Sequence, residues 1–290
     1  MVIFHDARCA EFGSDLRPEQ PARVLRTVPH LQAMHPEWTW RSPPAADDTA
    51  CLRAHTAEHL ERLGHGPDFD EDTPYFPNVI AHARRGAGAA IAAAEAALDG
   101  QQAFSLMRPP GHHATADRAM GFCYLNSVAI AAFHILCLGR ARRVAVWDFD
   151  AHHGNGTEAI LAGRDDCLFA SVHQSPGYPG TGNESVGNVH NWSIAPRGPR
   201  AQHLEALRAS LDTVIAFNPD LVLVSAGFDA FVRDPITSMS LETEDFATLG
   251  AWLRESGRPV AAVLEGGYSA DLPQLVDAFL TAWMREGSAA

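Results

Sequence analysis

Two carboxylates and two imidazoles lie within six consecutive residues, directly after an apolar run. The segment 148–153 reads Asp-Phe-Asp-Ala-His-His and follows the run 144–147. Burying such groups without a metal or a charged partner costs several kcal/mol for each group. Asp150 and His152 are two residues apart, so in an extended segment both side chains project to the same side and can reach one ion. The pattern therefore predicts a metal site.

A third ligand is expected at Asp229, which ends the segment Ser-Ala-Gly-Phe-Asp after another apolar run. Gly227 allows the backbone to approach closely there. These aspartates could instead cap helices or close turns, but that interpretation leaves a cluster of buried charge unpaired. A catalytic zinc takes about three protein ligands and keeps one position open, and ferrous iron accepts the same ligand types. The predicted ligands are Asp150, His152 and Asp229.

Two further groups could act on a substrate beside this metal. His112 and His113 follow Arg-Pro-Pro-Gly, and the prolines restrict the backbone that carries both imidazoles. Paired imidazoles suit general acid–base hydrolysis, because one takes the proton of water while the other steadies charge. Tyr268 follows two glycines at the end of an apolar run, where its phenol could stabilise a tetrahedral oxyanion. Together these groups predict metal-assisted hydrolysis.

The elements that position these residues are strand-length apolar runs alternating with helical stretches. Unbroken runs such as 144–147 and 221–224 are typical of strands covered on both faces. In open parallel sheets, ligands bind beyond the carboxyl ends of the strands, and the polar residues Asp148, Ser171 and Tyr268 all follow such runs. Strands are predicted at 2–4, 103–106, 144–148, 168–172, 221–225 and 260–264, and helices at 78–99, 124–138, 201–217, 243–256 and 271–286.

The predicted fold class is α/β, with a single domain over residues 1–290 in which helices sandwich a parallel β-sheet. The first seventy residues are predicted to form mainly helices and loops at the rim. Of the 290 residues, 46% are hydrophobic, which suffices for one sizeable core, and neither a repeat nor a low-complexity linker divides the chain. The residues set no expectation for the oligomeric state.

Composition excludes several other functions. A net charge of −13 argues against nucleic-acid binding, because phosphate recognition needs clustered positive charge. The chain contains no lysine, which excludes a Schiff-base lysine and a phosphate-loop lysine. Its five scattered cysteines have no C-x-x-C spacing, so neither a disulfide framework nor a thiolate zinc site is indicated. No apolar run approaches the ~20 residues of a membrane span, and a cytoplasmic location is expected.

Six motifs in order resemble the histone deacetylase superfamily, which includes lysine deacetylases, acetylpolyamine amidohydrolases and acetoin-utilisation deacetylases. The resemblance covers nearly the whole chain and implies the arginase/deacetylase fold. The motifs are Arg108–His113, Gly121–Asn126, Asp148–Thr157, Ser171–His173 with Pro179–Gly182, Ser225–Asp229, and Glu265–Tyr268.

The resemblance also implies a role for each matching residue around the metal. His113 is expected to be the general base and acid, with His112 as a second, mainly electrostatic imidazole. Asp148 would be the carboxylate partner of His112, and Tyr268 would stabilise the oxyanion. The partner of His113 is Asn155, as in class II-like members, and an amide leaves this imidazole less basic than a carboxylate would.

Four residues are expected to contact the substrate. Gly121, Phe122 and Tyr178 resemble the walls of the family's narrow tunnel for an acyl-amine chain. Asp72 resembles a rim aspartate that grips the substrate backbone. The family also binds a monovalent cation such as potassium, which here would involve Asp148 and Ser171.

Acetyl-lysine, in a protein or a small molecule, is the expected substrate, and acetylpolyamine is the alternative. Binuclear manganese ureohydrolases are a second class, but they need Asp-x-His-x-Asp and Asp-x-Asp motifs. Here Gly154 stands where the first motif needs a ligand, and Asp229 has no aspartate two residues further on. A non-catalytic protein that binds acyl amines is the third alternative, although relict members of the superfamily usually lose the tyrosine or a metal ligand.

Overall fold

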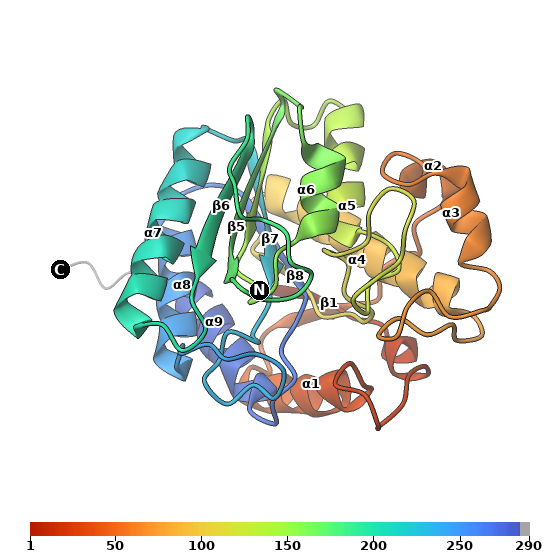
Figure 1. Ribbon diagram of the computed structural model, residues 1–290, viewed down its shortest axis with the longest axis horizontal. Helices are drawn as coiled ribbons and strands as arrows, with labels where there is room; N and C mark the ends of the chain where they lie inside the picture. Colours follow the sequence, from red (N-terminus) through yellow and green to blue (C-terminus); the bar gives the residue numbers. More distant parts are fainter. Residues whose placement is uncertain (285–290) are drawn as a thin grey trace.

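Eight parallel strands form one continuous sheet in the middle of the molecule, with the order β2-β1-β3-β8-β7-β4-β5-β6 (Figure 1). The computed structural model describes residues 1–284. Each pair of neighbouring strands is parallel. The strands are β1 (Val2–Phe4), β2 (Thr39–Arg41), β3 (Ala103–Ser105), β4 (Val144–Asp148), β5 (Cys167–Gln174), β6 (Val189–Ile194), β7 (Leu221–Ala226) and β8 (Val260–Leu264).

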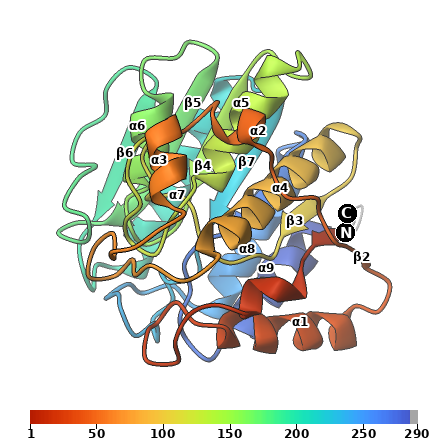
Figure 2. The ribbon, with the colours of Figure 1, turned by 90° about the vertical axis from the view of Figure 1, so that its right-hand side faces the viewer.

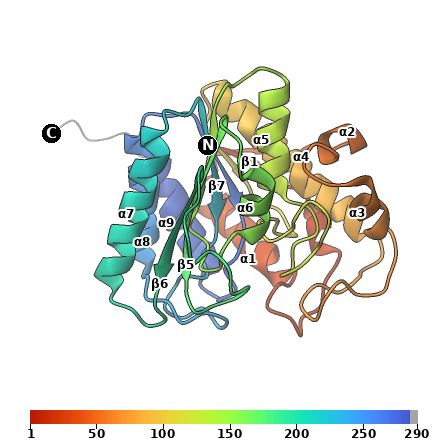
Figure 3. The same cartoon turned by 45° about the horizontal axis from the view of Figure 1, so that its top comes forward.

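Helices cover both faces of the sheet. On one face, α4 packs against α5 and β8, and α5 contacts α6; on the other, α7 lies on β4, β5 and β6, and α8 packs against α9 (Figure 1). Figure 2 shows α1 beside α9, and Figure 3 shows α2 and α3 outside the layer of α4 and α5. The helices are α1 (Ala22–Met34), α2 (Asp48–Cys51), α3 (Ala57–Arg62), α4 (Val79–Leu98), α5 (Ser127–Cys137), α6 (Asn155–Leu161), α7 (Arg200–Ala216), α8 (Thr243–Glu255) and α9 (Leu272–Met284), with a 3-10 turn η1 (Ala7–Ala10).

The central strands β4, β7 and β8 are buried along their whole length. Their unbroken apolar sequences are what a strand requires when helices cover both of its faces. The α/β class with a parallel sheet between helices is thereby confirmed, as are the six predicted strands and the five predicted helices. Residues 285 and 286 of the last predicted helix, like the final residues of the domain predicted over 1–290, lie outside the described residues.

The two outermost strands, β2 and β6, were not predicted. Both are largely exposed or half-buried, and their sequences Thr-Trp-Arg and Val-His-Asn-Trp-Ser-Ile lack an unbroken apolar run. An edge strand has one neighbour and needs no such run. The first seventy residues nevertheless form mainly helices and loops, as expected, and β2 is the one unpredicted strand among them. Within residues 1–284, no helix has both the length and the apolar character needed to span a bilayer.

All strands point the same way, so their carboxyl ends meet along one edge of the sheet. The segments that follow β3, β4, β5, β7 and β8 leave the sheet at this edge. In open α/β sheets, this edge is where ligands bind.

Candidate metal and catalytic site

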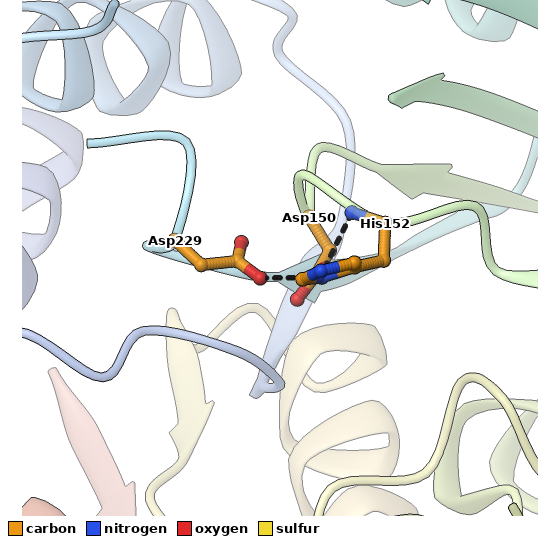
Figure 4. Close-up of side chains that lie close together, drawn as sticks. All are labelled: Asp150, His152 and Asp229. Carbon is orange, nitrogen blue, oxygen red and sulfur yellow. Dashed lines mark hydrogen bonds and ion pairs between the residues drawn. The ribbon is translucent and has the colours of Figure 1, made fainter. Parts of the chain in front are cut away.

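The segment after β4 carries Asp150 and His152, and the segment after the adjacent strand β7 carries Asp229. One ligand atom from each residue lies within 4.8 Å of the other two (Figure 4). His152 Nδ1 is 2.8 Å from Asp229 Oδ2 and 3.2 Å from Asp150 Oδ1. The structure thus brings together the three residues predicted to hold a metal.

The chemistry of this cluster fits a cation. Asp150 accepts backbone N–H groups from His152 (2.9 Å) and Gly266 (2.7 Å), and Asp229 Oδ1 accepts the N–H of Ala151 (2.8 Å). The other oxygen, Asp229 Oδ2, is buried and accepts no hydrogen bond within residues 1–284, although it faces His152 Nδ1 at 2.8 Å. A Cβ on Gly266 would lie 2.5 Å from the nearest oxygens of both carboxylates. The glycine therefore leaves room beside a buried oxygen whose charge a cation would compensate.

Two imidazoles lie next to the cluster, with ring centroids 4.0 Å apart. His112 Nδ1 is 3.0 Å from Asp148 Oδ2, and His113 Nδ1 is 2.8 Å from Asn155 Oδ1. The buried carboxylate of Glu265 accepts the backbone N–H of His112 (3.1 Å). Both Nδ1 atoms therefore have partners; His112 Nε2 lies 3.7 Å from Asp150 Oδ1, and His113 is the imidazole of the pair that lines the cavity described below.

The two imidazoles titrate in opposite directions. Burial disfavours a charge on His112, but the carboxylates of Asp150 and Asp148 outweigh burial and raise its pKa to about 10. Burial, together with the positive charges of His112 and His152, lowers the pKa of His113 well below its usual value. Near neutral pH, the pair therefore consists of a charged His112 and a neutral His113.

Tyr268 follows β8 and reaches the same site from the opposite side. Its backbone N–H donates to Asp234 Oδ2 (2.8 Å). The guanidinium of Arg23 lies 4.8 Å from its ring centroid and donates to the carbonyl of Gly267 (2.8 Å). Burial raises the pKa of the Tyr268 phenol well above its usual value. The phenol therefore keeps its proton and can donate a hydrogen bond.

A cavity of about 220 Å³ opens above these groups. Its lining contains every residue predicted to contact the substrate, together with three of the predicted metal and catalytic residues. The sequence analysis missed only two lining residues, both from loops. The lining residues are Pro18, Asp72, His113, Gly121, Phe122, His152, Tyr178, Ile236 and Tyr268.

The narrow part of this cavity depends on a glycine. Gly121 has a φ of 55°, and a Cβ there would lie 2.6 Å from His113 Cδ2 and 2.9 Å from Tyr178 Cε1. Phe122 also has a positive φ, 68°, and its N–H donates to Thr73 Oγ1 (3.0 Å). A side chain at position 121 would therefore displace either the imidazole or the phenol ring.

Asp148 and Ser171 face each other on the neighbouring strands β4 and β5. Ser171 Oγ is hydrogen-bonded with His173 Nδ1 (2.9 Å). Binding of a monovalent cation by this pair stays a prediction.

Besides Pro18, three contributors to the site received no role from the sequence. Glu265 had a detectable signal, because it is a carboxylate at the end of an apolar run, like Asp148. Ile236 and Asp234 lie in the loop after β7, whose apolar residues recur with neither the period of a strand nor that of a helix. Only the folded chain shows that they reach the site.

Comparison with known proteins finds relatives along most of the chain. Residues 17–283 match the family described as the histone deacetylase domain. The histone deacetylase-like amidohydrolase of Pseudomonas aeruginosa is 38% identical over 283 residues, which cover 90% of this chain and 74% of the relative. Acetylpolyamine amidohydrolase 2 of the same species is 35% identical, with 90% of this chain and 80% of the relative covered. The crystal structure of an acetylpolyamine aminohydrolase from Burkholderia pseudomallei has a TM-score of 0.89 and 27% identity, with 98% of both chains covered.

Proposed function

Because this chain belongs to the histone deacetylase family, we propose that it is a zinc-dependent hydrolase that removes acetyl groups from amines, with acetyl-lysine as the substrate group. Family membership supports hydrolysis of an acyl amide. The observation that carries the proposal is the position of the Asp-His-Asp cluster beside a histidine pair and a tyrosine, at the base of a narrow cavity.

Asp150, His152 and Asp229 would hold the zinc, and ferrous iron would accept the same ligands. When bound, the ion would supply Lewis acidity to the substrate carbonyl and to the attacking water. Asp148 and Ser171 would bind a monovalent cation below this site.

Side chains of the protein would transfer the protons and stabilise the charge that develops. Neutral His113 would take a proton from the attacking water at Nε2 and pass it to the leaving amine nitrogen. Charged His112, held by Asp148, would stabilise the negative charge that develops on the carbonyl oxygen. The Tyr268 phenol would donate a hydrogen bond to the same oxygen. The C–N bond breaks, a C–O bond forms, and acetate and the free amine leave.

The cavity suits an unbranched amine chain, because Phe122 and Tyr178 line it and Gly121 leaves room beside Tyr178 and His113. An acetylpolyamine is the second candidate. Two carboxylates near Tyr178, the half-buried Asp70 and the exposed Asp72, favour it because they would attract the positive charges of a polyamine. Three relatives are named acetylpolyamine amidohydrolases.

The test compares metal-free protein with protein reloaded with zinc or iron, on an acetyl-lysine peptide and on an acetylated polyamine. Tyr268→Phe should lower kcat by about 10²–10³-fold, the usual loss for one oxyanion donor. Tyr75→Phe is the matched control, because its hydroxyl donates to Gly64 O (3.1 Å) in an exposed loop. The faster substrate decides between the two candidates.

Two outcomes would overturn the proposal. Zinc bound at one equivalent without turnover of either substrate would indicate a protein that binds acyl amines. Two metal ions per chain, with hydrolysis of a guanidino substrate, would indicate ureohydrolase chemistry.

A further inference from the structure

The segment that carries Tyr268 has unusual backbone freedom. Two glycines precede the tyrosine, and Gly267 has a φ of 114°, a conformation that side chains rarely adopt. A phenol that acts on one oxygen atom must nevertheless be held closely, because a misplacement of about 1 Å can cost about 10²-fold in rate. Arg23 and Asp150 hold the two glycines, so the position of the tyrosine itself depends on what its own N–H contacts.

The buried side chain of Asp234 provides a contact of this kind. Its Oδ2 accepts the N–H of Tyr268 (2.8 Å), and its Oδ1 accepts the N–H of Ile236 (3.1 Å). Its own N–H donates to the carbonyl of Phe231 (2.9 Å), so the carboxylate is tied to the loop after β7. Asp234 is 7% exposed, and no arginine or histidine within residues 1–284 forms an ion pair with it.

The two N–H groups belong to residues that line the cavity from different strands. Tyr268 comes from the segment after β8, and Ile236 comes from the loop after β7. That loop is itself anchored, because Leu241 pairs with Phe231 and Gln174 accepts the N–H of Ser238 (2.8 Å). One carboxylate thus joins the segment of Tyr268 to the loop after β7.

We infer that Asp234 is a positioning residue, which aligns the Tyr268 phenol with the cavity by accepting the backbone N–H groups of Tyr268 and Ile236 together. The inference rests on the proposed deacylation. Removing one acceptor should let the backbone at Tyr268 shift and misplace the phenol, while Gly266 keeps its hydrogen bond to the metal ligand Asp150.

The test is a double-mutant cycle between Asp234→Asn and Tyr268→Phe in the zinc-loaded protein. Asparagine keeps the size of the side chain but turns an N–H toward one of the two backbone N–H groups. Asp234→Asn alone should lower kcat by about 10–100-fold and leave KM within about two-fold, as expected for an interaction made in the transition state. In the Tyr268→Phe background, the same change should lower kcat by less than about two-fold.

Asp220→Asn is the matched control. Asp220 Oδ2 also accepts two backbone N–H groups, those of Arg142 (2.7 Å) and Arg143 (3.0 Å), but it directly precedes β7, at the opposite edge of the sheet. This variant should keep the wild-type kcat. Zinc content should stay at the wild-type level in both variants.

Equal losses of kcat in the wild-type and Tyr268→Phe backgrounds would overturn the inference, as would wild-type kinetics for Asp234→Asn. If the asparagine variant does not fold, Asp234→Ser, which keeps one acceptor, replaces it in the same cycle.

Hydrogen exchange separates this inference from the proposed function. The Tyr268 amide should exchange at least about 10-fold faster in Asp234→Asn than in the wild type, because one protecting bond is weakened. This readout needs no substrate, so it holds even if the wild type hydrolyses neither acetylated amine. Unchanged exchange at Tyr268 would overturn the inference whatever the activity.

Discussion

The base of the cavity and its rim are built differently. The base residues His112, Asp150 and Asp229 are buried, and each carboxylate there orients backbone N–H groups. At the rim, Tyr178 is 38% exposed and Ile236 is 37% exposed. The base follows directly from the strand ends, whereas the rim is made by loops. The residues of the proposed reaction therefore lie at the edge of the sheet, and the proposed substrate contacts lie on segments that can change without disturbing it.

The largest effect is expected when a negative charge is removed from the base of the cavity. Asp229→Asn keeps the acceptor for the N–H of Ala151 but replaces Oδ2, the oxygen that faces His152 Nδ1, by an amide NH₂ group. Zinc content and kcat/KM should both fall, the latter by more than about 100-fold, because even residues that only orient a ligand cost up to that much. Metal analysis and steady-state kinetics measure both effects. Full zinc content with normal turnover would remove Asp229 from the ligand set.

A buried histidine outside the site should make the free energy of unfolding depend on pH. His203 on α7 is fully buried, and neither ring nitrogen has a partner within residues 1–284. Burial lowers its pKa to about 4. The unfolded chain therefore binds a proton at higher pH than the folded chain does. The contribution of neutral His203 to the free energy of unfolding is therefore complete above pH ~6.5. It is lost as the pH falls toward 4, which lowers the free energy of unfolding by up to about 3 kcal/mol.

His203→Leu should make the free energy of unfolding less dependent on pH over this window. Urea titrations at pH 7, 5.5 and 4.5 measure the slope, with the exposed His65→Leu as the control. Identical slopes for His203→Leu and the wild type would show that His203 is not buried as a neutral ring.

A smaller effect is expected when the basicity of the His113 imidazole is changed. Asn155→Asp places a negative charge beside His113 Nδ1, 2.8 Å from the present amide oxygen. This charge should raise the pKa of His113, which burial now lowers. A general base must be neutral, so activity should disappear sooner on acidification, and the acid limb of kcat/KM should move up by about one pH unit. Asn183→Asp, in an exposed loop, should leave the limb in place; a limb that stays fixed in Asn155→Asp would argue against His113 as the base.

The smallest effect is expected at the rim. Asp72→Asn removes an exposed charge and should raise KM for an acetylated polyamine by about five-fold at most, since exposed charge pairs contribute about 0.2–1 kcal/mol. The change should shrink at high salt, while kcat stays constant. Glu255→Gln on α8 is the control far from the cavity. A large fall in kcat for Asp72→Asn would contradict the separation of rim and base.

The sequence predicted the central part of the fold and the base of the site for the same reason. Buried strands require unbroken apolar runs, and a carboxylate directly after such a run, as at Asp148 or Asp229, is conspicuous. The edge strands β2 and β6 are half-exposed and carry no such pattern. The catalytic roles of the base residues stay predictions, although the structure brings these residues together.

Asp234 shows why the remainder was out of reach. It contacts Tyr268 across 34 residues of chain, and the loop that carries it has no periodic pattern. Its partner is a backbone N–H group, which every residue except proline possesses. The contact therefore leaves no trace in the identity of the partner residue.

The parallel direction of all eight strands has a consequence for how such a protein can change over generations. The segments at the site edge leave a strand end and lead to a helix or, after β5, to the parallel strand β6, so their lengths can vary without loss of a ladder hydrogen bond. Insertions and deletions in the loops around Tyr178 or Ile236 can alter which amine enters, while the residues at the strand ends keep their positions. Selection, in nature or in a laboratory library, can therefore act on substrate range and on bond cleavage as two nearly independent traits.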